Sequence, residues 1–248
     1  MNIKLSQVHK SFSGRPVIKD MTMAIPSGDI VCLLGPSGSG KTTTIRLLIG
    51  AIAADSGIIK FDDITVPNLK LLNRIGFMPQ NDALYDDLNG ENNLRFFGEL
   101  FHIDKKRLTK RISEMLELVD LSADRKKYVR DYSGGMKKRL SLAAALLHEP
   151  DVLLLDEPTV GIDPVLRHNI WKQFKQIKAS GKTIIVSTHV MDEVTECDKA
   201  ALIYQGSLIH YDAVEKLLAR TKSGKVEELF FAAAATSMDE GQKGGESV

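Results

Sequence analysis

The chain has 248 residues, 43% of them hydrophobic and 26% charged, a balance typical of a globular protein with a well-buried core. Its 33 lysines and arginines nearly equal its 32 acidic residues, so the net charge gives no support to a polyanionic partner. The longest apolar run, residues 229–235, is far shorter than the roughly 20 residues needed to cross a bilayer. We therefore expect a globular protein without a membrane span of its own.

The first residues and the two cysteines indicate the cellular compartment in which the protein is expected. Residues 1–4 already resemble the start of a strand and carry no secretory signal. Cys32 and Cys197 offer no disulfide framework, and Cys32 lies in an apolar run where a small buried side chain is the usual finding. These features predict a cytoplasmic protein with reduced cysteines.

Short alternating segments at residues 3–5 and 17–18 predict N-terminal strands. A continuous apolar run at 30–34 predicts a strand that is buried on both faces. Glycine-rich sequence follows directly, and residues 45–50 then predict a helix. This strand, loop and helix is typical of an α/β domain.

The glycine-rich segment between that strand and helix has the pattern of a phosphate-binding loop. Glycines let backbone N–H groups turn toward phosphate oxygens, and the helix N-terminus adds the positive end of a dipole. Lys41 is expected to hold the β- and γ-phosphates, and Thr42 to be a Mg²⁺ ligand. The pattern also arises by chance, but the flanking strand and helix favour a functional loop. The residues expected to bind nucleotide here are Gly35, Pro36, Ser37, Gly38, Ser39, Gly40, Lys41, Thr42 and Thr43.

The middle of the chain has no strong strand signal. Its apolar residues repeat at helical spacing, at Leu108, Ile112, Met115, Leu116 and Val119. This pattern predicts an all-helical subdomain inserted into the α/β core. Gln80 lies at the junction between core and insert. It is either a solvated loop residue or a residue that contacts Mg²⁺ and the attacking water and moves with the insert.

A second glycine-rich stretch, residues 132–136, stands between the phosphate loop and a later Asp-Glu pair. Ser133 can cap the helix that follows, and Gly134 and Gly135 leave its first N–H groups accessible to an anion. Alone, Ser-Gly-Gly is an ordinary loop sequence. Between those two neighbours it predicts a second phosphate-binding element, one that a single subunit does not need for itself.

Asp156 and Glu157 close another buried strand at residues 152–155, which we expect to lie beside the phosphate loop. Asp156 is placed to hold Mg²⁺ through water, and Glu157 to orient and deprotonate the attacking water. An Asp-Glu pair at a strand end is also an ordinary helix start. The phosphate loop upstream favours the catalytic interpretation.

Asp163 and Pro164 predict the N-cap and first turn of the next helix, and residues 183–186 predict another buried strand. His189 follows that strand. A lone histidine is more often structural, but one at the carboxyl end of a strand whose neighbour ends in Asp-Glu is a candidate for contacting the γ-phosphate. A short helix is expected after residue 211. From residue 236 onward, Gly, Ser, Glu and Lys dominate and predict a disordered tail over 236–248.

These elements together resemble the ATP-binding-cassette (ABC) ATPases, and the resemblance covers nearly the whole chain with the motifs in the family's order and spacing. The resemblance gives Phe12 the role of stacking on adenine. It identifies residues 35–42 as the phosphate loop, Gln80 as the glutamine loop and Ser133, Gly134 and Gly135 as the signature. It also makes Thr42, Gln80 and Asp156 the metal positions, Glu157 the catalytic base, residues 161–164 the subunit-crossing loop and His189 the switch histidine.

The resemblance implies an α/β fold: a RecA-like P-loop NTPase core with a mostly parallel sheet, N-terminal antiparallel strands and the inserted all-α subdomain. The expected divisions of one ABC ATPase domain, 1–235, are a core of 1–85 and 149–210, a helical signature subdomain of 86–148 and a C-terminal segment of 211–235. In this family two domains pack head to tail, and each ATP, with Mg²⁺, lies between one phosphate loop and the other signature. ATP closes the dimer, and hydrolysis opens it.

Met136 is the one departure from the family's signature, which usually has glutamine there. A glutamine could return a hydrogen bond to the Ser133 backbone and complete a capping box, whereas methionine cannot. The departure removes a supporting contact and leaves the Ser-Gly-Gly contacts to phosphate in place.

A single cassette without a coiled-coil insertion favours the subunit of a membrane transporter. It would work with a separate permease and a second ATPase subunit, as a homodimer or with a different cassette. Residues 91–98 and 226–230 resemble the exporter-type branch. The alternatives are an importer ATPase, a soluble ATPase acting on nucleic acid or the ribosome, and a P-loop kinase. Residues 105–139 are rich in Lys and Arg, which suits either a solvated helix face or an anionic partner; we expect no nucleic acid. The expected location is the cytoplasmic face of the membrane.

Overall fold

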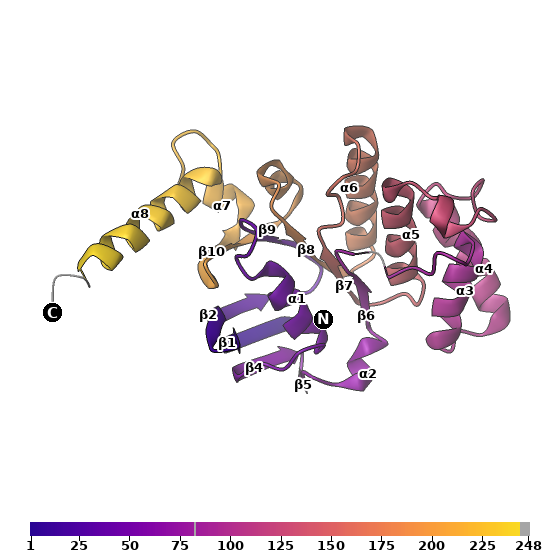
Figure 1. The fold of residues 1–248 in the computed structure, drawn as a ribbon, viewed down its shortest axis with the longest axis horizontal. Coiled ribbons are helices and arrows are strands. Elements are labelled where there is room, and N and C mark those ends of the chain that lie inside the picture. Colours follow the sequence, from indigo (N-terminus) through magenta and orange to yellow (C-terminus); the bar gives the residue numbers. More distant parts are fainter. Residues whose placement is uncertain (82, 244–248) are drawn as a thin grey trace.

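Two β-sheets form the centre of the protein, in a computed structural model that describes residues 1–81 and 83–243 (Figure 1). The order of the six strands in the larger sheet is β10 (Ser207–Ala213), β9 (Lys199–Tyr204), β3 (Ile30–Leu34), β8 (Thr183–Thr188), β7 (Val152–Asp156) and β6 (Ile75–Met78). All neighbouring pairs from β9 to β6 are parallel, and β10 is antiparallel to β9. The mostly parallel sheet predicted from the sequence is confirmed.

The smaller sheet is antiparallel and contains the N-terminal strands. Its order is β2 (Arg15–Ile25), β1 (Ile3–Phe12), β4 (Ser56–Phe61) and β5 (Ile64–Thr65). Helix α1 (Lys41–Ile49) packs between the two sheets, since its apolar residues share one core with both. Every residue of β3, β7 and β8 is buried, which explains why these strands appear in the sequence as unbroken apolar runs.

The predicted helical region gathers at one end of the larger sheet, beyond β6 and β7 (Figure 1). Its elements are α3 (Gly90–Leu100), α4 (Lys105–Leu118), the 3-10 turn η1 (Val129–Asp131) and α5 (Gly134–Leu146). The predicted stripe of α4 is buried and joins one continuous apolar core with β7 and β8. The other helical elements are α2 (Leu69–Leu72), α6 (Pro164–Ala179), the 3-10 turn η2 (Met191–Glu196), α7 (Val214–Leu218) and α8 (Glu227–Lys243).

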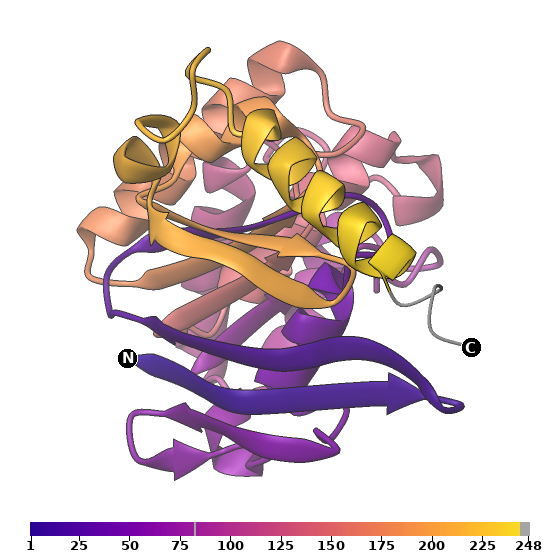
Figure 2. The same ribbon diagram turned by 90° about the vertical axis from the view of Figure 1, so that its left-hand side faces the viewer.

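Helix α8 corrects the predicted tail. The sequence predicts disorder from residue 236, whereas the helix continues to Lys243; residues 244–248 of that prediction lie outside the described residues. The run of alanines at 232–235 explains the continuation, because alanine has the highest helix propensity. Leu229 and Phe230 pack into the core beside β9, and the rest of α8 projects away from the sheet in Figure 1, on the side that faces the viewer in Figure 2. Within the described part of the chain, no helix has the length and apolar character to cross a membrane.

Candidate functional site

The phosphate loop connects β3 to α1, as predicted. Gly40 precedes the helix with a φ of 110°, a conformation that other residues rarely adopt. A Cβ atom at this position would lie 2.7 Å from Ile18 Cδ1 and 3.0 Å from the Val17 carbonyl oxygen. Glycine therefore allows the loop to pack closely against β2.

Lys41 begins α1, and its side chain turns back beneath the loop. Its Nζ donates hydrogen bonds to the carbonyl oxygens of Gly35, at 2.7 Å, and Pro36, at 3.0 Å. The residue is buried, and this burial lowers the pKa of its ammonium group against the opposing effect of the Glu157 and Asp156 carboxylates. A charged group held by two neutral carbonyls can readily exchange them for phosphate oxygens.

Gly35, Pro36 and Ser39 do not line the cavity that borders the loop; Gly35 and Ser39 are buried, and Pro36 is exposed. A Cβ at Gly35 would lie 2.2 Å from the Ile203 carbonyl oxygen, so this position requires glycine for close approach to β9. Ser39 is buried, and its backbone N–H donates to the Pro36 carbonyl. These predicted nucleotide residues thus contribute backbone geometry.

The Thr42 and Asp156 side chains form a hydrogen bond, although β3, which leads to the phosphate loop, and β7, which ends at Asp156, are not neighbouring strands. The end of the Asp156 strand lies beside the phosphate loop, as expected, although β8 separates β7 from β3 in the sheet. The first turn of α1 reaches over β8 and brings Thr42 Oγ1 to 3.2 Å from Asp156 Oδ1. Ser187, at the end of β8, donates its hydroxyl to the same Asp156 oxygen.

This pair fits a Mg²⁺ site. Hydroxyl and carboxylate oxygens are ligands that Mg²⁺ prefers, and Mg²⁺ commonly takes one or two protein ligands together with substrate phosphates and water. Accordingly, no cluster of three His, Cys, Asp or Glu side chains is needed, and none occurs among residues 1–81 and 83–243.

Glu157 directly follows β7 and is the centre of a hydrogen-bonded group. Its Oε2 accepts a hydrogen bond from Gln80 Nε2 at 3.0 Å, and its Oε1 lies 3.0 Å from His189 Nδ1. Gln80, Glu157 and His189 follow β6, β7 and β8, so the carboxyl ends of three neighbouring parallel strands bring the predicted catalytic residues together. The Glu157 carboxylate is buried, yet it faces a cavity.

That cavity has a volume of about 210 Å³. It lies between the phosphate loop and the pair formed by Gln80 and Glu157. Its lining consists of Val17, Ser37, Gly38, Gly40, Lys41, Thr42, Thr43, Gln80 and Glu157. One face of the chain therefore presents cationic, hydroxyl and carboxylate groups to one ligand. This is the set of groups that phosphoryl transfer from a nucleotide to water requires.

Phe12 lies outside this lining. It ends β1 with 44% of its surface exposed, and Lys10 Nζ is 5.4 Å from the centroid of its ring. An exposed aromatic face is available for stacking, so the role in adenine binding stays a prediction.

The signature residues also do not line the cavity. Ser133 caps α5, where its Oγ accepts a hydrogen bond from the Met136 N–H at 3.2 Å. A Cβ built at Gly134 or Gly135 would meet no heavy atom within 4 Å. The N-terminus of α5 is therefore open to a ligand that this chain's own phosphate loop does not hold.

Two further residues of the site were not predicted. Ser187 binds Asp156, and Lys138 Nζ donates to the Glu157 carbonyl oxygen at 2.9 Å. A hydroxyl at the end of an apolar strand was a usable signal for Ser187. Lys138 gives no such signal, because it lies in a run of basic residues and contacts a backbone atom.

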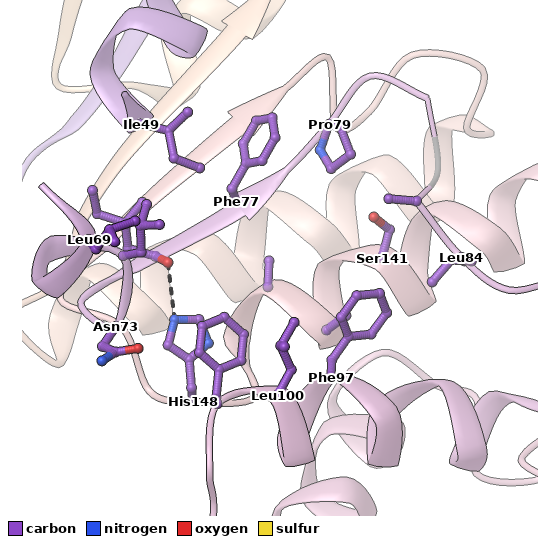
Figure 3. A pocket seen from close by; sticks show the side chains of 16 residues that line it. Ile49, Leu69, Asn73, Phe77, Pro79, Leu84, Phe97, Leu100, Ser141 and His148 are labelled. Carbon is purple, nitrogen blue, oxygen red and sulfur yellow. Dashed lines mark hydrogen bonds between the residues drawn. The ribbon is translucent and has the colours of Figure 1, made fainter. Parts of the chain in front are cut away.

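A second cavity, of about 460 Å³, is apolar and lies between the sheet and the helical region (Figure 3). Phe77 and Pro79 from β6 and the following loop face Phe97 and Leu100 of α3 across it. His148 closes one side, stacked on Phe101 at a centroid distance of 3.8 Å, with Nε2 lying 3.0 Å from the Ile75 carbonyl oxygen. Burial lowers the pKa of His148, so the neutral imidazole is favoured in this apolar cleft.

Comparison with known proteins agrees with this geometry. The family described as "ABC transporter" matches residues 18–160. The linearmycin resistance ATP-binding protein LnrL of Bacillus subtilis is 35% identical over 92% of this chain and 74% of its own length. The Nod factor export ATP-binding protein I of Paraburkholderia xenovorans is 37% identical over 92% of this chain and 76% of its own length. The ABC transporter G family member 20 of Dictyostelium discoideum is 39% identical, but the chain spans only 32% of its length.

Solved structures show the same fold. The ATP-binding subunit of an ABC transporter superimposes with a TM-score of 0.83 at 23% identity, over 94% of this chain and 99% of the other. A dimeric ATP-binding cassette in a post-hydrolysis state, bound to ADP and Pi, superimposes with a TM-score of 0.79 at 24% identity, over 85% of this chain and 98% of the other. The predicted P-loop NTPase fold is thereby confirmed. The chain belongs to the ABC transporter family, as an ATP-binding and ATP-hydrolysing subunit.

Proposed function

We propose that this chain is the ATPase subunit of an ABC exporter and drives a separate integral membrane permease from the cytoplasmic face of the membrane. The observation that carries this proposal is the separation of two phosphate-binding elements. Lys41 and Thr42 share a cavity with Glu157, whereas Gly134 and Gly135 are open to solvent and do not line it. A chain that exposes half of an ATP site needs a second chain to complete that site.

Head-to-tail pairing of two copies provides the missing half. The N-terminus of α5 offers free N–H groups and the positive end of a helix dipole, both of which suit a γ-phosphate held by the partner. All the expected catalytic positions are present in this chain, which supports a homodimer over pairing with a degenerate cassette.

The positions of the site residues support the following roles. Glu157, held between Gln80 and His189, is placed to accept a proton from the attacking water. His189 can contact the γ-phosphate once ATP displaces its bond to Glu157. Thr42 and Asp156 would hold Mg²⁺, which would neutralise charge on the phosphates, and Lys41 would add its own positive charge.

The apolar cleft is the surface that we assign to the permease. Its rim exposes large apolar side chains, with Leu69 84% and Leu100 63% exposed, as a docking groove for an amphipathic helix does. Phe77 and Pro79 in its wall lead directly to Gln80, which bonds Glu157. A cytoplasmic helix of the permease seated there would be linked to the catalytic base through one short segment.

The nucleic-acid alternative receives little support from the basic segment. Its cations largely have acidic partners within the chain: Arg107 pairs with Glu149, Arg111 with Glu114, Arg130 with Asp87 and Lys137 with Asp86. Charges that are already neutralised contribute less to binding a polyanion. The names of the bacterial relatives, which refer to export and resistance, favour an exporter over an importer.

Purification of the tagged full chain from detergent-solubilised membranes tests this proposal. We expect one integral membrane protein to co-purify, and its presence to stimulate MgATP hydrolysis with phosphate released to water. If the tagged chain is recovered without any membrane protein and binds DNA in a salt-dependent way, it is instead a soluble ATPase. Phosphate transfer to a small acceptor would identify a kinase.

A further inference from the structure

Lys138 connects the signature helix to the catalytic base of the same chain. It lies on α5, whose N-terminus carries Ser133, and its Nζ reaches across to the Glu157 carbonyl oxygen at 2.9 Å. The element that faces the partner's ATP is thereby bonded directly to the residue that serves this chain's own ATP.

The backbone conformation of Glu157 explains why the bond from Lys138 affects the orientation of this residue. Glu157 has a φ of 51°, in the left-handed region that residues other than glycine rarely adopt. Its N–H is fixed by the Ser187 carbonyl and hydroxyl oxygens, each at 3.1 Å. Because Pro158 follows, the next peptide has no N–H, and its carbonyl oxygen is its sole hydrogen-bonding atom. Lys138 is therefore the group that orients this peptide.

The side-chain carboxylate of Glu157 is held by groups from different elements. Gln80 and His189 bond the carboxylate, so its position depends on contacts from the glutamine loop, from β8 and, through Lys138, from α5. A displacement of α5 moves Lys138 and rotates the peptide from which the Glu157 side chain projects. General-base catalysis is sensitive to small misplacements of this kind.

We propose that Lys138 is a positioning residue that couples the two ATP sites of the dimer. When the partner's ATP engages Ser133, Gly134 and Gly135, α5 is fixed, and Lys138 then holds the Glu157 peptide in its productive orientation. Each base thus becomes fully active only when the other site is occupied. This inference rests on the proposed head-to-tail dimer and adds to it a route by which one site senses the other.

Steady-state ATP hydrolysis by the full chain, measured against MgATP concentration, tests the coupling. We expect wild type to have a Hill coefficient between one and two for its two sites. In Lys138→Met, kcat should fall about tenfold and the Hill coefficient should approach one, because misplacing a catalytic group lowers turnover without removing ground-state binding. The affinity of the monomer for a fluorescent ATP analogue should stay unchanged. Lys138→Arg, which keeps a cationic donor, should restore most of the cooperativity.

Lys137→Met is the matched control, because it removes the same charge from the same helix but breaks an ion pair with Asp86 instead. It should keep the wild-type Hill coefficient. A cooperative Lys138→Met enzyme, a non-cooperative wild type, or an equal loss in Lys137→Met would each overturn the proposal. If Lys138→Met does not fold, Lys138→Gln, whose shorter side chain cannot reach the carbonyl, carries the same test. Failure of the ATP-bound dimer to form in wild type or Glu157→Gln would instead count against the proposed function.

Discussion

Lys41 is held beneath the phosphate loop by the carbonyl oxygens of Gly35 and Pro36, and it faces the same cavity as Glu157. Replacing it with alanine removes the one buried cation of that lining. We expect Lys41→Ala to weaken MgATP binding about 10- to 100-fold, since a charge-assisted bond to phosphate is lost. Equilibrium titration with a fluorescent ATP analogue measures this loss. Lys60→Ala, at an exposed lysine of β4, is the control, and wild-type affinity in Lys41→Ala would refute the assigned role.

Met136 stands where a glutamine would complete the capping box of α5. Ser133 Oγ already accepts the Met136 N–H, so only the return bond to the Ser133 backbone is missing. We expect Met136→Gln to raise the ATPase rate of the assembled complex about twofold, because a firmer cap is worth a few tenths to one kcal/mol. Met136→Leu, which cannot form that bond, should behave as wild type. Equal ATPase rates for Met136→Gln and wild type would show that the missing return bond does not limit the rate.

The residues that could be predicted are those whose chemistry is local in the sequence. Gly40 and Ser133 act through the turn or helix in which they stand, so short patterns reveal them. Ser187 and Lys138 act on atoms far away along the chain, Asp156 Oδ1 and the Glu157 carbonyl oxygen. No single-sequence pattern specifies such contacts, because they depend on which strands and helices become neighbours.

At the scale of elements, Glu91 fixes the start of α3 to the loop that leads toward the signature. Its carboxylate forms ion pairs with Arg95 at 3.2 Å, and with Arg125 and Lys126 at 2.9 Å each. The hydrogen bonds from Lys126 and then Arg125 lower the pKa of Glu91 and outweigh the opposing effect of its burial. The Glu91 N–H also donates to the Arg125 carbonyl oxygen at 3.0 Å, so side chain and backbone hold the same loop.

We expect Glu91→Gln to lower the free energy of unfolding by about 1–2 kcal/mol at neutral pH, a range reduced by solvent because Lys126 is 72% exposed. A carboxyl whose pKa is lowered by folding stabilises the protein above its unfolded value of about 4.3, and this contribution is lost as the pH falls through the folded pKa. Urea unfolding should therefore show a difference from wild type that shrinks as the pH falls below that unfolded value. Glu117→Gln, on the exposed face of α4, should show little change. A pH-independent difference would contradict the ionic explanation.

The type of most elements could be predicted, but their neighbours could not. Buried parallel strands such as β3, β7 and β8 appear as apolar runs, and the α4 stripe has a clear helical period. The insertion of β8 between β3 and β7 is a property of strand order, which no run of residues encodes. The continuation of α8 past residue 236 differs from the prediction because the polar residues there indicate disorder, whereas the alanines before them favour a helix that extends to Lys243.

At the scale of the whole molecule, the two phosphate-binding elements belong to different parts of the fold. The phosphate loop lies at the carboxyl end of β3, and the signature lies at the N-terminus of α5 in the helical region (Figure 1). The apolar cleft lies between these parts and has walls from both. This arrangement supports a dimer in which ATP joins two copies while a permease contacts the cleft.

ATP-dependent dimerisation of two variants tests the central claim most directly. Glu157→Gln should bind ATP without hydrolysing it and form a stable dimer in light scattering. Gly135 has open space around its Cβ position and no unusual φ, so Gly135→Asp adds a negative charge without an internal clash. We predict that Glu157→Gln with Gly135→Asp stays monomeric in MgATP, because the carboxylate repels the partner's γ-phosphate, while its ATP affinity equals that of Glu157→Gln measured as a monomer. A dimer that persists in the double variant, or a monomer that loses ATP affinity, would contradict a signature that serves the partner's ATP.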